Sequence, residues 1–138
     1  MAHIENATTS QQVQQFLDKN GGVAVVDCFA TWCGPCKAIS PYVHQKNTST
    51  GIPLITVDVD QSEELSAAYQ ISAMPTFLVI KGQWNNVVNK VVGGGQPNVD
   101  KVYKIAQQSK WFTSGTKGND LISFISNIFS YIFLILLK

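Results

Sequence analysis

The stretch Val26–Lys37, VDCFATWCGPCK, joins an apolar run to a predicted helix start and carries two cysteines three positions apart. Its first residues belong to the run Val23–Ala30, which is almost continuously apolar and rich in β-branched residues. Such a run is typical of a strand buried on both faces. A helix is expected to begin at residues 32–33, which places both thiols on its first turn. Thiols at this spacing can close a small disulfide with little rearrangement, so the stretch predicts a redox-active pair.

The two cysteines, Cys33 and Cys36, are expected to have different roles. Backbone N–H groups and the helix dipole at a helix start favour negative charge, so the Cys33 thiolate should be stabilised and reactive. Cys36 is expected to lie deeper and to resolve a mixed disulfide by intramolecular attack. Asp27, alone among apolar neighbours, should have a raised pKa, which suits a general base near neutral pH.

A zinc site is the main alternative use of these thiols. Structural zinc needs four ligands, and the chain offers only Cys28, His3 and His44 besides the pair, with no second closely spaced pair. Two incidental thiols are the other alternative. The context of the pair favours redox chemistry over both.

The amino-acid composition limits the classes of protein to which the chain can belong. The chain has 138 residues, an apolar fraction of 45%, a charged fraction of 14% and a net charge near +1. All of its basic residues are Lys, and no charged field predicts nucleic acid as a partner. The first fifteen residues lack an apolar stretch behind a basic segment, which argues against a secretory signal. A cytoplasmic location and cysteine chemistry, rather than structural bridging, are therefore expected.

The rest of the chain alternates short apolar runs with amphipathic stretches in the order β-α-β-α-β-α-β-β-α. The expected helices follow Thr8–Ser10, begin at residues 32–33, span Ser62–Tyr69 and follow Pro97. After the first strand of this order, the expected strands are Val23–Ala30, Ile52–Val59, Thr76–Ile80 and Val87–Val92. Strands separated by helices imply parallel crossovers, whereas the last two strands are too close for a crossover and must be antiparallel. The order predicts an α/β fold, a three-layer α/β/α sandwich with a central mixed sheet.

Four segments resemble landmarks of the thioredoxin family. They are Val26–Lys37 with its WCGPC motif, Val57–Asp60, Ser72–Phe77 and Val91–Gly94, in the order and spacing of that family. The resemblance covers about residues 2–110 and implies the thioredoxin fold. It also implies that Cys33 is the nucleophile, Cys36 the resolving thiol and Asp27 the buried proton acceptor.

Further site residues follow from the same resemblance. Pro75 matches the cis-proline that lies opposite the disulfide and exposes the backbone of Met74 to an extended substrate peptide. The implied substrate-binding residues are Trp32, Gly34, Pro35, Met74 and Gly93.

The chain departs from the family pattern at several positions. Phe29 stands where many members have Trp, and Thr56 stands where bacterial-type members place a Lys beside the buried acid. Polar residues 44–47 replace the apolar end of the second helix, so that helix is expected to be short or frayed, with a turn at Thr48–Gly51 and an exposed His44. Cys28 is interpreted as a buried core thiol.

The resemblance implies a protein-disulfide reductase that serves cell redox homeostasis and electron transport. A flavin-containing thioredoxin reductase that uses NADPH would restore the dithiol, and no cofactor is expected to bind this chain itself. The implied clients are peroxiredoxins, ribonucleotide reductase and methionine sulfoxide reductases. The alternatives are a disulfide isomerase-like domain and a membrane-tethered adaptor that uses the fold without catalysis.

The composition changes abruptly after Lys110. We expect a domain over residues 1–110, a polar linker over 111–120 and a hydrophobic tail over 121–138. Residues 121–137 hold no charge and would form a helix of about 25 Å, slightly short of the ~30 Å hydrocarbon core of a bilayer. Three interpretations stay open: a transmembrane anchor that holds the domain on the cytosolic side, an interfacial helix, and a read-through segment without function.

Overall fold

The computed structural model describes residues 2–114, 128, 132–133 and 135–137. The elements follow the predicted order. The strands are β1 (His3–Ile4), β2 (Val23–Phe29), β3 (Leu54–Asp58), β4 (Thr76–Lys81) and β5 (Val87–Val92), and the helices are α1 (Ser10–Lys19), α2 (Gly34–Thr50), α3 (Glu63–Ala68) and α4 (Gln96–Ser114).

The five strands form one mixed sheet in the order β1-β3-β2-β4-β5. Strands β1, β3 and β2 run parallel to one another, while β4 is antiparallel to β2 and β5 is antiparallel to β4. This arrangement confirms the predicted mixed sheet, including the antiparallel last pair. The central strand is β2, which carries Asp27 and leads directly into the cysteine pair.

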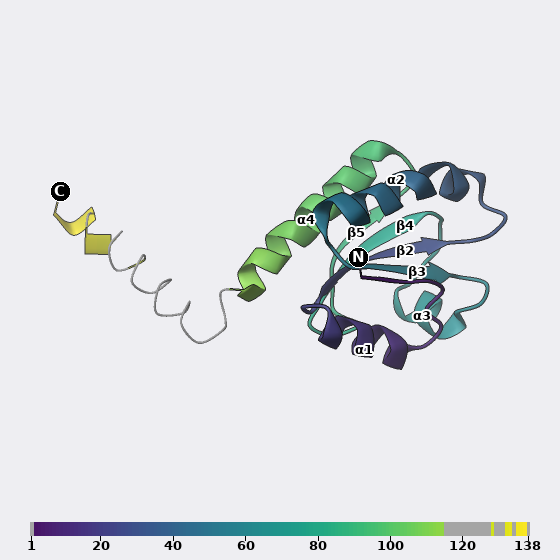
Figure 1. The fold of residues 1–138 in the computed structure, drawn as a ribbon, viewed down its shortest axis with the longest axis horizontal. Helices are drawn as coiled ribbons and strands as arrows, with labels where there is room; N and C mark the ends of the chain where they lie inside the picture. The colour runs from purple at the N-terminus through teal and green to yellow at the C-terminus, as the bar shows by residue number, and fades with distance from the viewer. Residues whose placement is uncertain (1, 115–127, 129–131, 134, 138) are drawn as a thin grey trace.

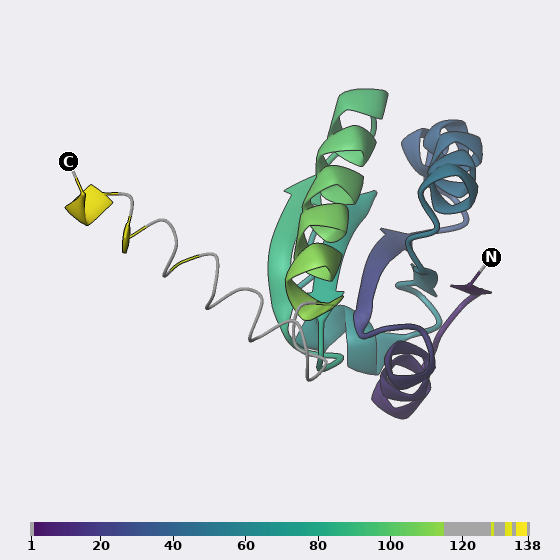
Figure 2. The same ribbon diagram turned by 60° about the vertical axis from the view of Figure 1, so that its left-hand side comes forward.

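The helices cover both faces of the sheet, α2 and α4 on one side and α1 and α3 on the other (Figures 1 and 2). Each face has its own apolar core, because alternate residues of each strand point to opposite faces. Val25 and Phe77 pack with α2 and α4, whereas Val26 and Leu78 pack with α1 and α3. The three-layer sandwich expected from the sequence is therefore confirmed, and Asp27 shares the α2 face with Val25.

Helix α2 is longer than the sequence predicts. It continues to Thr50 instead of ending in a turn at Thr48–Gly51, so the expectation of a short or frayed helix is wrong. Gly51 ends it in the left-handed conformation with φ 69°, which glycine adopts without a steric penalty. The buried amide of Asn47 donates to the carbonyl oxygens of Ala2 and Ile52 at 3.1 and 2.7 Å, which ties the last turns to the sheet edge.

Two helix ends also differ in detail. The Ser62 hydroxyl does not cap α3 and instead donates to the carbonyl oxygen of Ala7 at 2.7 Å. Helix α4 runs to Ser114, past the boundary expected at Lys110. By contrast, Thr9 caps α1 in a reciprocal box with Gln12, and Thr9 lies in the stretch Thr8–Ser10 at which that helix was expected to begin. No helix among the described residues is long and apolar enough to cross a bilayer, and most of the expected tail lies outside those residues.

Candidate active site

The two cysteines lie at the junction between β2 and α2. Cys33 is the N-cap of α2, and its Sγ accepts a hydrogen bond from the Cys36 backbone N–H at 3.3 Å. Cys33 and Cys36 form a disulfide with their Cα atoms 5.3 Å apart. A sulfur at an N-cap meets the positive end of the helix dipole, which is the environment that favours a thiolate there. In this oxidised state both cysteines are 5% exposed, so Cys36 is not the more buried of the two.

Asp27 lies below α2 as the only acidic side chain of β2. Its neighbours in the sheet are Thr56 on β3 and Phe77 on β4. The side chain is buried, and its Oδ1 accepts no hydrogen bond from any residue that the structure describes. Because burial removes the charged form from water, it raises the pKa of Asp27 to about 7, as the sequence predicts.

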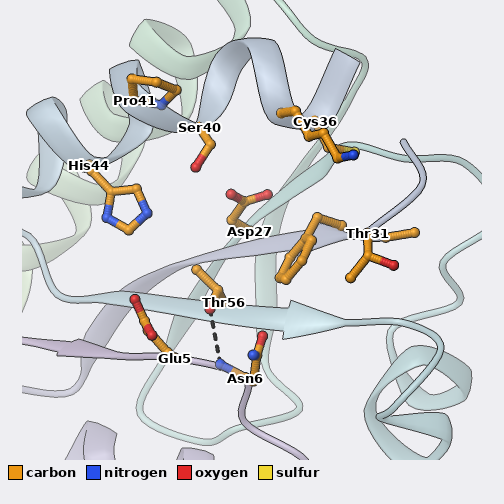
Figure 3. Close-up of a pocket in the computed structure, with 12 residues that line it drawn as sticks. Glu5, Asn6, Asp27, Thr31, Cys36, Ser40, Pro41, His44 and Thr56 are labelled. Atoms are coloured by element: carbon orange, nitrogen blue, oxygen red, sulfur yellow. Dashed lines mark hydrogen bonds between the residues drawn. The ribbon is translucent and has the colours of Figure 1, made fainter. Parts of the chain in front are cut away.

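A cavity of about 510 Å³ opens beside Asp27 between α2 and the β1–β3 edge of the sheet (Figure 3). Ser40 and His44 enter it from α2, and Thr56 lies across from them on β3. The complete lining is Glu5, Asn6, Asp27, Phe29, Ala30, Thr31, Cys36, Lys37, Ser40, Pro41, His44 and Thr56. The cavity therefore reaches both the resolving thiol expected at Cys36 and the carboxyl expected to take its proton.

The loop before β4 lies against the cysteine turn. The Met74–Pro75 peptide bond is cis, as the resemblance implies. The Pro75 carbonyl oxygen accepts from the Gly93 N–H at 2.9 Å, which joins this loop to the end of β5. A Cβ on Gly94 would lie 3.6 Å from the Pro35 Cβ and 3.7 Å from the Pro75 Cγ. Three segments far apart in the sequence thus meet at the disulfide.

Exposed apolar groups surround this meeting point. Trp32 is 68% exposed, and its indole N–H donates to the Asp60 carboxylate at 2.9 Å, which holds the ring at the surface. Val92, next to Gly93, is 54% exposed, and Met74 is half-buried. Such a cluster can dock an extended apolar peptide next to the disulfide.

Sequence reasoning placed some residues correctly and missed others. Cys28 is fully buried, as expected, and burial together with the nearby carboxyl of Asp27 raises the pKa of its thiol. His44 is half-buried against His3, with ring centroids 4.9 Å apart, and not exposed as expected. Ser40 was not predicted, and Asp60 was named only as the end of the landmark Val57–Asp60, not as the partner of Trp32. Their positions at the site depend on the folded chain, so the sequence gives no signal for them.

Metal binding finds no support in the described part of the chain. There, no cluster of three or more His, Cys, Asp or Glu side chains is arranged to hold an ion. The disulfide is the redox group that the structure provides.

The family model for thioredoxin matches residues 4–108. Thioredoxin Asp f 29 of Aspergillus fumigatus is 37% identical over 108 residues, which cover 75% of this chain and 96% of that protein. The chain spans only 55–63% of three further thioredoxin relatives.

Solved structures agree with these matches. The reduced thioredoxin pre-protein of Schistosoma mansoni superposes with a TM-score of 0.66 at 35% identity, over 79% of this chain and 99% of that one. A chain from a structure of thiol resolution in yeast mitochondrial 1-Cys peroxiredoxin by glutathione/thioredoxin systems gives 0.65 at 26% identity. That match covers 74% of this chain and 94% of the other.

Proposed function

The chain belongs to the thioredoxin family and is a thiol–disulfide oxidoreductase with Cys33 and Cys36 as its redox-active pair, and we propose that Cys33 is the nucleophile and Cys36 the resolving thiol. The observation that carries this assignment is the position of Cys33 at the N-cap of α2. There its sulfur accepts a backbone N–H, whereas Cys36 lies inside the first turn and lines the cavity beside Asp27.

The proposed reaction starts from the reduced pair. The Cys33 thiolate attacks one sulfur of a substrate disulfide, and the other substrate sulfur leaves as a thiolate. Cys36 then loses its proton to the Asp27 carboxylate and attacks the Cys33 sulfur. The bond between Cys33 and the substrate breaks, the second substrate thiolate leaves, and the protein is left with the Cys33–Cys36 disulfide.

Asp27 is suited to this proton transfer. Its pKa of about 7 lets the carboxylate accept a proton near neutral pH and release it again after resolution. The carboxyl and Cys36 line the same cavity, which supports a transfer directly or through a single water.

A substrate surface is proposed around the disulfide. It comprises Trp32, Gly34, Pro35, Met74 and Gly93, with Pro75 setting the backbone of Met74. The hydrogen bond from the Gly93 N–H to the Pro75 carbonyl oxygen and the exposure of Trp32 support this choice. An extended substrate segment would pair with the Met74 backbone while its side chains contact Trp32.

The partners are proposed by class. A thioredoxin reductase that draws on NADPH would return two electrons to the disulfide. Peroxiredoxins, ribonucleotide reductase and methionine sulfoxide reductases are the proposed disulfide substrates. The resemblance to a chain from a study of peroxiredoxin thiol resolution by glutathione/thioredoxin systems supports the first of these.

Insulin reduction in the presence of dithiothreitol tests the proposed activity. Cys33→Ser should abolish turnover, because no other thiol can start the exchange, whereas Cys28→Ser removes a buried thiol outside the pair and should keep it. A Cys33→Ser protein as active as the wild type would refute the nucleophile assignment.

Alkylation of the reduced protein separates the two roles. Iodoacetamide at neutral pH should label Cys33 first, because the N-cap position lowers the thiol pKa relative to that of Cys36. Mass spectrometry of digested protein identifies the labelled site. First labelling of Cys36 or Cys28 would reverse the assignment.

The remaining expectations concern location and domains. We propose a domain over residues 1–110 that works in the cytoplasm, and a tail over residues 121–137 that anchors it to a membrane with the domain facing the cytosol. The family match ends at residue 108, before the change in composition, which supports a separate tail.

A further inference from the structure

The cavity beside Asp27 extends beyond the cysteine pair to surface residues, and the disulfide exchange does not use this outer part. Asp27 is 5% exposed, yet its carboxyl faces a space of about 510 Å³ that also reaches the surface residue Lys37. None of the described residues donates a hydrogen bond to Asp27 Oδ1. Buried polar atoms of this kind are normally paired with water where a cavity is roomy and offers polar partners. This cavity has room for water, and Ser40, His44 and Thr56 are polar side chains in its lining.

Polar side chains continue from Asp27 toward the outside along one wall of the cavity. In Figure 3 Ser40 points from α2 toward the Asp27 carboxyl, and His44, one turn further along α2, points into the same space. On the opposite wall the Thr56 hydroxyl accepts the Asn6 N–H at 3.0 Å (Figure 3). Unlike Asp27, His44 is half-buried, so part of its side chain is accessible to bulk water.

We propose that this cavity is the route by which Asp27 exchanges its proton with bulk water, and that His44 is the positioning residue that relays the proton at its outer end. The inference rests on the proposed role of Asp27 as the proton acceptor of Cys36. Histidine suits the relay because one ring nitrogen can take a proton while the other gives one up near neutral pH.

In the proposed route, one proton moves from Cys36 to bulk water in each catalytic cycle. When Cys36 resolves the mixed disulfide, its proton moves to the Asp27 carboxylate, and one proton must leave Asp27 before the next cycle. A cavity water takes that proton and passes it to one nitrogen of His44, which releases a proton from the other nitrogen to bulk water. No electrons move in this step, and the final acceptor is the solvent buffer.

Several other titratable groups lie around His44. Glu5, from the segment after β1, and Lys37, on α2, line the cavity, while Cys36 is the proton source. His3 of β1 contacts the His44 ring. Burial, followed by the charge of His44, lowers the pKa of His3, which disfavours a proton on His3.

The test separates the two thiol steps with 5,5′-dithiobis(2-nitrobenzoate). Reduced protein releases one nitrothiolate when Cys33 attacks and a second when Cys36 resolves, and stopped-flow absorbance follows both phases. A pH-indicator dye in weak buffer follows the appearance of protons in bulk water during the second phase.

His44→Gln should leave both nitrothiolate phases of the first turnover unchanged, because the route acts only after Cys36 has attacked. It should slow the proton signal by about tenfold, less than the ~10²-fold that a directly acting base contributes. Imidazole added to His44→Ala should restore the rate of the proton signal, because the cavity is open to a small base. Ser40→Val, which makes the route narrower and apolar without changing His44, should show the same slowing.

Gln45→Ala is the matched control, since Gln45 is the exposed neighbour of His44 on the same helix. It should match the wild type in both phases and in the proton signal. The inference is overturned if the proton signals of folded His44→Gln and Ser40→Val also match the wild type, or if imidazole restores nothing. Asp27→Asn separates the role of Asp27 from that of the route. An unchanged second phase in Asp27→Asn would refute the proposed acceptor itself. A slowed second phase in Asp27→Asn, together with wild-type proton signals in His44→Gln and Ser40→Val, would overturn only the route.

Discussion

At the scale of single residues, the carboxyl of Asp27 links the stability of the oxidised protein to pH. Its folded pKa is raised from 3.8 to about 7, so the folded state holds a proton that the unfolded state has lost. The stabilisation is complete below pH 3.8 and is lost as the pH rises through 7. Asp27→Asn removes this loss, so the variant should exceed the wild type in stability at pH 8 by up to about 4 kcal/mol, with little difference near pH 4.

Urea unfolding of both proteins between pH 4 and pH 8 measures the effect. Asp18→Asn is the control, because it removes an exposed carboxyl from α1, and its pH profile should follow that of the wild type. Parallel profiles for Asp27→Asn and the wild type would contradict the buried, protonated carboxyl.

At the scale of elements, one amide holds the end of α2 to the sheet edge. Asn47 donates to the carbonyl oxygens of Ala2 and Ile52, and both would lose a donor in Asn47→Ala. A buried polar atom left without a partner costs about 1–3 kcal/mol, and we expect a loss of unfolding free energy in that range. Urea unfolding at pH 7 provides the measurement.

Thr48→Ala is the matched control on the same turn, since Thr48 is exposed. It should change stability by no more than about 0.5 kcal/mol, as surface substitutions usually do. Equal losses in the two variants would show that the α2 end is not held by Asn47.

At the scale of the whole molecule, the packed core ends before the change in composition. The buried residues of α4 within residues 96–110 are Val99, Val102, Tyr103 and Ala106. The Tyr103 hydroxyl also donates to the Val43 carbonyl oxygen on α2 at 3.1 Å. A chain truncated after Lys110 should therefore fold and reduce insulin at the full-length rate, measured side by side.

A chain truncated after Val99 is the control, because it loses three of those four buried side chains and should not fold. Inactivity of the chain that ends at Lys110 would show that the domain extends further.

The proposed anchor makes a separate prediction for the full-length chain. Expressed in cells, it should stay with membranes after carbonate extraction, because the uncharged residues 121–137 would remain in the hydrocarbon core. The chain truncated after Lys110 should be released into the supernatant. Release of the full-length chain as well would remove the anchor interpretation.

Local patterns along the chain were sufficient to predict the order of the elements and the chemistry of the pair. Short-range patterns carry this information: the apolar run of β2, the C-x-x-C spacing and the isolated Asp27 within that run. Each depends on neighbours along the chain and on general preferences for burial and charge, so each can be interpreted without coordinates. The crossovers and the antiparallel last pair follow from connection length alone.

The meeting of distant segments could be seen only in the folded chain. The Asn47 amide donates to the carbonyl oxygens of Ala2 and Ile52, and these contacts hold the polar end of α2, where helix propensity is weak, against the sheet edge. The cavity that joins Asp27 to Ser40 and His44 lies between α2 and the β1–β3 edge. Hydrogen bonds and cavities between residues far apart in sequence depend on the relative placement of packed elements, and no local pattern encodes that placement.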